Sequence, residues 1–373
     1  MPANDRPPHT EDPPNPVDPA GPTDPAADPV ARIDALASGY REAQILMTGV
    51  RLGLFEALDD APAAADTLAG RLGADRRGVR ILCDALAALG VLEKDRDGRY
   101  RNGEGAREAL LPGGPRSKVA MLLHGARLYE RWAKLHDAVR SGARVPEEAI
   151  DPRLASDERS FAAAMSDVAR ESAVKTADAL EALGALEGVR RILDVGGGPG
   201  HYAVELARRL PEARAVVLDG AETVAVARET AARAGLSDRV EGRAGDAFED
   251  DLSAAGGPFD LIFVSNLIHI YPAAENRRLI GNAARALAPG GRLAVKDFLL
   301  EEDRTRPSGG ALFAVNMLVS TDGGDCYTVE EVRSWFEEHG LEPGRTIDVT
   351  AQSRLSLARK PARKPARTPA RTP

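Results

Sequence analysis

Between residues 191 and 297, short apolar runs alternate with segments whose apolar residues recur every three or four positions. The runs are rich in Ile, Leu, Val and Phe, as buried strands are, and cover 191–195, 215–219, 259–264 and 292–297, with a weaker run at 240–243. The periodic segments between them, 201–210, 223–234 and 274–287, predict helices. The alternation predicts an α/β fold: a mostly parallel sheet with helices on both faces and ligands at the carboxyl ends of its strands.

Ahead of this region the pattern is helical. Residues 33–111 form short amphipathic segments, including a helix over 79–90 that ends at a glycine, followed by the hairpin signal Asp97-Gly98. Helix, turn, helix and small hairpin are typical of a winged helix. Further predicted helices follow up to residue 186, among them 132–139 and 161–183.

The two ends of the chain have a different composition. The start is dominated by Pro, Asp and Ala, and the end is a basic Pro-Ala-Arg repeat, so neither can bury enough apolar surface to offset its chain entropy. The predicted organisation is therefore a disordered tail (1–30), a winged-helix domain (31–111), linking helices that contribute to a substrate pocket (112–186), an α/β ligand-binding domain (187–357) and a disordered basic tail (358–373).

Charge and cysteine content narrow the function. A net charge of -8 argues against a nucleic-acid partner and favours a small-molecule one. Cys83 and Cys326 are far apart and have no neighbouring His ligands, which predicts no disulfide, no metal site and a cytoplasmic setting. No apolar run is long enough to span a membrane, and the start does not resemble a signal peptide. A winged-helix regulator remains the non-enzymatic alternative, although its presumptive recognition helix is mostly aliphatic.

A glycine loop follows the first strand of the α/β region. Asp194, Gly196, Gly198 and Gly200 give the pattern acid-x-Gly-x-Gly-x-Gly, in which backbone amides can approach a ligand closely. A dinucleotide fingerprint fits less well, because its last glycine would fall on His201; the variant ending in Ala keeps that alternative open.

Two further acids select the ligand. Asp219 ends the second strand, where a carboxylate can accept both ribose hydroxyls, and Asp246 with Phe248 follows the third, where they would contact an adenine ring. If the ligand is S-adenosylmethionine, Asp194 would lie near its cationic amino group and its sulfonium. Together these positions predict S-adenosylmethionine (SAM) as the cofactor, with S-adenosylhomocysteine as its product.

At this point the sequence resembles the class I small-molecule O-methyltransferases of the caffeic-acid, acetylserotonin and hydroxyneurosporene type. The shared segments are 193–200, 217–219, 245–248, 265–269 and 287–292. The resemblance implies a winged-helix dimerisation domain, a Rossmann-like SAM domain with Ser265 at the cofactor, and a homodimer in which the front domain also closes the partner's substrate pocket.

His269 follows the fourth strand and matches the position of the family's catalytic His, so it is the expected general base, with Asp297 beside it after the fifth strand. Two positions depart from the family: Ile270 stands where an acid commonly follows the His, and Cys326 where a second flanking acid is expected.

The resulting hypothesis is methyl transfer to a hydroxyl of a small aromatic or polyketide-like acceptor. C- or N-methylation by the same fold remains open, because a carbon or nitrogen nucleophile needs less deprotonation. The candidate acceptor residues, which are equally credible as core, are His124, Trp132, Phe161, Met165, Phe313, Asn316 and Met317.

Overall fold

The computed structural model describes residues 28–114, 116–154 and 158–362. Its first part contains α1 (Pro29–Ser38), α2 (Tyr40–Arg51), η1 (Glu56–Leu58), β1 (Ala63–Ala64), α3 (Ala65–Leu72), α4 (Arg76–Ala88), β2 (Leu92–Lys94) and β3 (Arg99–Asn102). Helix α4 begins where the Asp75 side chain accepts a hydrogen bond from the Gly78 amide. The strands pair in the order β1-β3-β2. Leu68, Leu86 and Tyr100 are buried between these strands and helices, which gives the predicted winged helix its own core.

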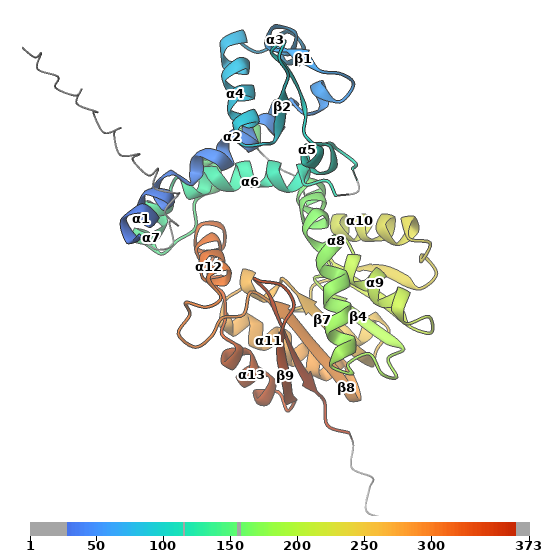
Figure 1. The fold of residues 1–373 in the computed structure, drawn as a ribbon. Helices are drawn as coiled ribbons and strands as arrows, with labels where there is room; N and C mark the ends of the chain where they lie inside the picture. Colours follow the sequence, from blue (N-terminus) through green and yellow to red (C-terminus); the bar gives the residue numbers. More distant parts are fainter. Residues whose placement is uncertain (1–27, 115, 155–157, 363–373) are drawn as a thin grey trace, which may run out of the picture.

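The linking helices are α5 (Glu104–Ala109), α6 (Val119–Trp132), α7 (Leu135–Ser141) and α8 (Glu158–Ala182), with the short turns η2 (Glu147–Ala149) and η3 (Pro152–Leu154). In Figure 1, α6 lies across the molecule and α8 runs down along the sheet. The helix predicted over 132–139 is confirmed as α7 from Leu135 onward, but its start was misplaced, because α6 ends at Trp132 and the chain turns at Ala133 and Lys134.

The sheet contains β4 (Arg191–Val195), β5 (Arg214–Asp219), β6 (Val240–Ala244), β7 (Phe259–Ser265), β8 (Leu287–Asp297), β9 (Glu342–Asp348) and β10 (Arg354–Arg359), in the order β6-β5-β4-β7-β8-β10-β9. The first five pair in parallel, and β10 is antiparallel to β8 and β9. The order reverses beside β4, so ligands are expected at the carboxyl ends of β4, β5 and β7.

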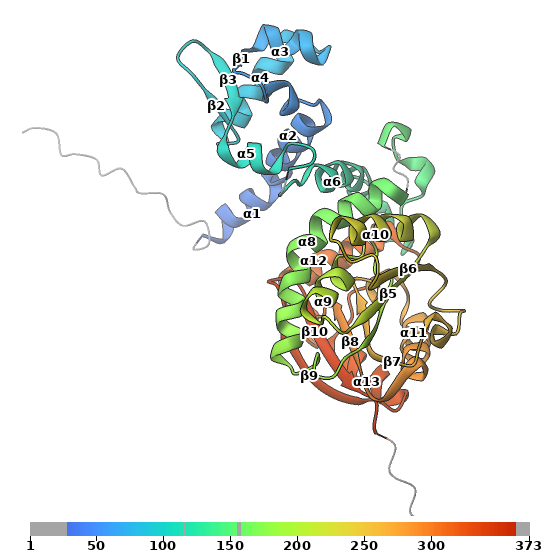
Figure 2. The same cartoon turned by 90° about the vertical axis from the view of Figure 1, so that its right-hand side faces the viewer.

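Helices cover both faces of this sheet, as Figure 2 shows. One face packs against α8, α9 (His201–Arg209) and α10 (Ala221–Arg233), and the other against α11 (Ala273–Ala286) and α13 (Val329–Glu338). The short turns η4 (Leu252–Ala255) and η5 (Ile268–Ile270) complete the loops. The nearly continuous apolar runs of β4 and β7 follow from this double burial.

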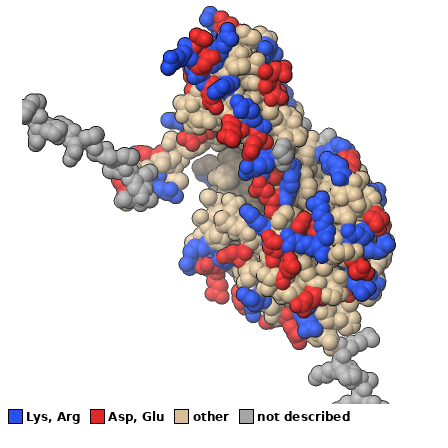
Figure 3. All heavy atoms as spheres, turned by 45° about the vertical axis from the view of Figure 1, so that its right-hand side comes forward, with Lys and Arg blue, Asp and Glu red and all other residues tan. Residues whose placement is uncertain are grey.

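Helix α12 (Ser308–Ser320) leaves the sheet after β8 and rises towards α6 and α7 (Figure 1). The backbone of Val145 donates a hydrogen bond to the Val319 carbonyl, which joins α12 to the linking helices. The molecular surface is hollowed between the front part and the sheet domain (Figure 3). Helix α6 contacts both α8 and α12, so the helices that carry the acceptor candidates are neighbours.

Both ends of the described chain reach into the segments predicted as tails. Helix α1 begins at Pro29, where the Asp28 side chain accepts from the Val30 amide, and β10 extends to Arg359. The Lys360 ammonium donates to the Ala284 and Leu287 carbonyls, 2.7 Å from each. Most of the predicted tails, 1–27 and 363–373, lies outside the described residues. No helix among the residues that the structure describes is long and apolar enough to cross a membrane.

Candidate active site

The glycine loop joins β4 to α9 at the centre of the sheet. Gly196, Gly198 and Gly200 have φ values of +62°, +55° and +79°, a conformation that favours glycine. A Cβ on Gly197 would lie 2.6 Å from the Asp194 Cγ, so the loop also passes too close to this carboxyl for any side chain. The sequence thus folds into a loop that presents backbone to a ligand.

Asp194 lies fully buried beneath this loop. Neither of its carboxylate oxygens accepts a hydrogen bond of normal geometry from the described part of the chain. Burial, with the nearby charge of Asp219, raises the pKa of Asp194 to about 7. A buried carboxylate without a donor fits a cationic ligand group, as the amino and sulfonium groups of SAM require.

Asp219 ends β5 at the edge of a pocket of about 430 Å³. Its two oxygens accept the amides of Gly198 and Gly220 at 2.8 and 2.7 Å, which ties β5 to the glycine loop. Burial raises the pKa of this carboxyl. The pocket is lined by Gly196, Leu218, Asp219, Gly220, Gly245, Asp246, Ala247, Phe248, Glu249, Leu267, Tyr271, Glu275 and Arg278. Its size is that of a typical small-molecule site.

An aromatic pair closes one side of this pocket. The rings of Phe248 and Tyr271 are 4.4 Å apart and inclined by 57°, while the Asp246 side chain accepts from the Phe248 amide at 2.8 Å. Asp246 and Phe248 thus lie together as predicted, and their contact with an adenine ring stays a prediction. Sequence reasoning missed Tyr271; its place two residues after His269 was the available signal.

His269 lies in η5, directly beyond the carboxyl end of β7. Its Nδ1 is 2.7 Å from the Asp297 Oδ1 at the end of β8. Burial alone would raise the pKa of Asp297, but the charge and hydrogen bond of His269, with the Phe298 amide and Lys296, hold it below its usual value. With Nδ1 engaged by the carboxylate, the free imidazole nitrogen is Nε2, so the pair is arranged for proton transfer at that atom.

The two departures from the family leave Asp297 as this pair's only acid in the described chain. Ile270 contributes no carboxylate, and Asp325 turns away to pair with Arg304 at 3.2 Å. Cys326 is buried, and burial near Asp297 raises the pKa of its thiol, so it is a packing residue.

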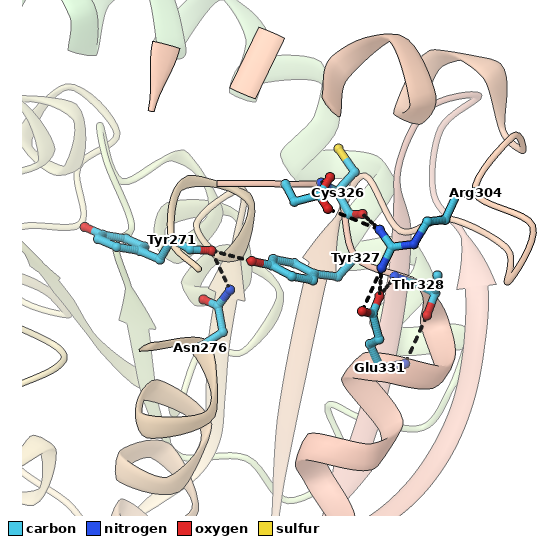
Figure 4. Close-up of polar contacts among 8 residues, drawn as sticks. Tyr271, Asn276, Arg304, Cys326, Tyr327, Thr328 and Glu331 are labelled. Atoms are coloured by element: carbon cyan, nitrogen blue, oxygen red, sulfur yellow. Dashed lines mark hydrogen bonds and ion pairs between the residues drawn. The ribbon is translucent and has the colours of Figure 1, made fainter. Parts of the chain in front are cut away.

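Hydrogen bonds to its backbone hold the turn that carries His269 (Figure 4). The Asn276 Nδ2 donates to the carbonyls of Ile268 and Tyr271 at 2.8 and 3.0 Å, and the Tyr327 hydroxyl donates to the same Tyr271 carbonyl at 2.6 Å. Asn276 and Tyr327 are buried; Asn276 lies in α11, and Tyr327 lies in the loop just before α13. The turn is therefore fixed from both sides.

Replacing Tyr327 with phenylalanine removes one of these hydrogen bonds without emptying the core. We expect kcat to fall about tenfold and the free energy of unfolding to fall by about 1 kcal/mol, because a net hydrogen bond contributes that much and a misplaced base slows proton transfer. Steady-state kinetics and urea unfolding measure both. Tyr40→Phe, at a half-exposed tyrosine, is the control; equal kcat in the two variants would contradict the role.

Among the acceptor candidates, Phe313 contacts His269. Phe313 stacks on Phe298 at 3.9 Å, and its ring lies edge-on to His269 at 4.9 Å. Farther along the opening, the Trp132 Nε1 donates to the Asn316 Oδ1 at 3.1 Å. Phe298 was not predicted, although it directly follows Asp297.

The remaining candidates lie on α6, α8 and α12. The His124 ring is edge-on to the half-exposed Phe161 at 5.5 Å. Met165 is partly buried in α8, and Met317 is buried in α12. Ser265 is buried at the end of β7 without a partner for its hydroxyl among the described residues, and it does not line the pocket.

Comparison with known families follows the same division of the chain. Residues 132–342 match the model of an O-methyltransferase domain, more than half of the chain, and residues 35–111 match that of an O-methyltransferase dimerisation domain. The chain belongs to the O-methyltransferase family. Its α/β domain is thus the methyltransferase domain, and its winged helix the dimerisation domain.

Individual methyltransferase relatives are similar to this chain over most of its length. It is 34% identical to the 3-hydroxy-5-methyl-1-naphthoate 3-O-methyltransferase of Streptomyces sahachiroi, over 84% of this chain and 89% of the relative. It is 30% identical to the N,N-dimethyltransferase OxyT of Streptomyces rimosus, over 89% and 98%. The structure of human N-acetylserotonin methyltransferase in complex with SAM is similar, with a TM-score of 0.76 and 27% identity over 90% of this chain and 99% of that one.

These similarities decide two questions that the sequence left open: whether the protein is an enzyme or a regulator, and whether its ligand is SAM or a dinucleotide. The protein is a SAM-dependent methyltransferase of the O-methyltransferase family with the predicted fold, and the comparisons give no support to a winged-helix regulator. SAM, rather than a dinucleotide, is the cofactor. In the described residues no group of three His, Cys, Asp or Glu side chains could hold a metal ion.

Proposed function

We propose that this enzyme methylates a hydroxyl of a small aromatic or polyketide-like acceptor, with His269 as general base and Asp297 as the residue that orients it. The observation that carries the proposal is the buried His269–Asp297 pair beside the stacked rings of Phe298 and Phe313. The naphthoate relative, which acts on a hydroxylated aromatic acid by its name, supports this acceptor class.

The protein's residues must align the acceptor and remove its proton. SAM supplies an electrophilic methyl group when it is bound. Asp194, the glycine loop, Asp219, Asp246 and Phe248 would hold the cofactor at the ends of β4, β5 and β6. A phenol titrates near pH 10, so at neutral pH the His269 Nε2 accepts its proton as the oxygen attacks. Asp297 accepts the Nδ1–H bond and stabilises the resulting imidazolium.

Phe313 would form a wall for a flat acceptor. We expect Phe313→Ala to raise the acceptor KM about tenfold and leave SAM affinity unchanged, because an aromatic contact and its buried area are lost at the acceptor alone. Leu312→Ala, on the exposed side of the same helix turn, is the matched control. Equal KM values in the two variants would remove Phe313 from the acceptor site.

The direct test is a screen of purified enzyme and SAM against phenolic, naphthoic and aminated polyketide acceptors. Mass spectrometry detects methylation, and NMR of the product identifies the atom. O-methyl products support the proposal, whereas methylation only at nitrogen or carbon would replace it. An N-methyltransferase is the second candidate, favoured by the similarity to an N,N-dimethyltransferase and by the loss of one flanking acid at Cys326.

The assembly proposed for the enzyme is a cytoplasmic homodimer whose front domain, 31–111, also closes the partner's substrate pocket. The match to a dimerisation domain supports it, as does an exposed apolar face on α1 formed by Val30, Ile33 and Leu36. Light scattering after size-exclusion chromatography tests the dimer, and a monomer at micromolar concentration would contradict it.

A further inference from the structure

A buried lysine stands at the carboxyl end of the sheet and is unused by the chemistry above. Lys296 is 3% exposed and occupies the next-to-last position of β8. Its ammonium donates to the Tyr202 hydroxyl of α9 at 3.3 Å and to the Asn266 Oδ1 at 3.2 Å. The side chain therefore lies on the α9 side of the sheet, at the edge where the glycine loop begins.

The surroundings of this ammonium are incomplete. Both hydrogen-bond acceptors are neutral, and within the described ranges Lys296 forms no direct ion pair, although the neighbouring carboxylate of Asp297 interacts with its charge. An ammonium has three N–H donors, and a buried charge is costly unless an opposite charge or full hydrogen bonding compensates it. Asn266, which holds Lys296 through its side chain, has a left-handed φ of 51°, a conformation that asparagine adopts more readily than other residues with a Cβ.

Two other incompletely bonded groups share this face. Ser265 is the register partner of Lys296 across β7 and β8. Asp194 is the register partner of Phe263 in β7, two residues before Ser265, so the alternation of side chains places Asp194, Ser265 and Lys296 on the same side of three adjacent strands. Asp194 and Ser265 are both more than nine-tenths buried, and in the structure as described their side-chain oxygens form no hydrogen bond of normal geometry.

The three groups are a carboxylate, a hydroxyl and an ammonium. An α-amino acid carries the complementary set, because its ammonium needs an anionic acceptor and its carboxylate needs a cation and a hydrogen-bond donor. SAM contains such an amino acid at its methionine end. A mononucleotide or an uncharged ligand would leave at least one of the three groups unpaired.

We infer that Lys296, with Ser265, binds the α-carboxylate of the methionine end of SAM, opposite Asp194 at the α-ammonium. This inference rests on SAM being the cofactor, and it adds Lys296 as a binding residue. Lys296 also bridges β8 to α9, so it sets the depth at which the methionine end lies relative to the glycine loop.

The test compares two ligands, SAM and decarboxylated SAM, which lacks only the carboxylate. In Lys296→Met, a change of similar shape, titration calorimetry should show SAM binding weakened at least tenfold and decarboxylated SAM binding within twofold of the parent. Ser265→Ala should show the same selectivity with a smaller loss. Lys360→Met removes a lysine that bonds carbonyls near the opposite end of β8 and is the matched control.

Equal weakening of both ligands in Lys296→Met would assign Lys296 a structural role and overturn the inference, as would unchanged SAM affinity. If Lys296→Met fails to fold, Ser265→Ala and the parent's own preference for SAM over decarboxylated SAM decide: no preference overturns the inference. Failure of the parent to bind SAM at all is a separate outcome and would overturn the cofactor assignment itself.

Discussion

Replacing His269 with alanine should lower kcat by two to four orders of magnitude while leaving SAM affinity within twofold of the parent. The loss is that expected for removal of a general base, and cofactor binding is spared because His269 does not line the cofactor pocket. Single-turnover methylation and calorimetric titration with SAM separate these quantities. Unchanged turnover would remove His269 from the mechanism.

Asp297→Asn tests the other member of the His269–Asp297 pair. The neutral amide does not stabilise an imidazolium as the carboxylate does, and its NH2 group can hold His269 in the wrong tautomer, so kcat should also fall by at least tenfold although His269 remains. The rate of His269→Ala should rise with pH as the acceptor hydroxyl ionises by itself near pH 10, since the base is then no longer needed. A flat profile for that variant would contradict proton removal as the lost step.

The second large effect concerns Asp194. Asp194→Asn should weaken SAM binding at least tenfold and, at the same time, stabilise the ligand-free protein above pH 7. In the folded protein the pKa of this carboxyl is about 7, above the ordinary value of 3.8, so the folded state retains a proton that the unfolded chain loses. The stability of the parent therefore falls as pH rises from about 4 to 7.

Two measurements check the expected effects of Asp194→Asn on stability and on SAM binding. Thermal unfolding of the ligand-free proteins should give a higher Tm for Asp194→Asn at pH 8 and a difference that shrinks towards pH 4. Calorimetry of SAM binding near pH 6.5, in buffers of different ionisation enthalpy, should show proton release in the parent and none from this site in the variant, because a cationic ligand lowers the pKa of Asp194. Equal SAM affinities would contradict the assignment.

Much of this architecture could be predicted from local patterns. The runs of β4, β5, β7 and β8 are strongly apolar because both faces of the sheet are covered, and the glycines around Gly198 are required by backbone conformation, so each leaves a direct trace in sequence. The signals that predict the winged helix are also local, among them the hairpin turn at Gly98.

What escaped prediction depends on contacts between distant segments. Lys296 is an ordinary residue in the sequence, and only the register of β8 with β7 places it beside Ser265. Tyr327 bonds the Tyr271 carbonyl across 56 residues. The antiparallel strands β9 and β10 were not predicted from the sequence. Their alternation of buried and exposed residues is weak.

Arg304 joins the segments that precede and follow α12. Its guanidinium contacts Asp325, the Cys326 carbonyl and Glu331, so the segments entering and leaving α12 are fastened together next to the sheet (Figure 4). Helix α12 lies between these two segments. It contains Phe313 and Asn316 and is not part of the sheet. If Phe313 and Asn316 line the acceptor site as proposed, we expect replacement of the segment 308–320 to alter the acceptor range and to leave SAM affinity unchanged.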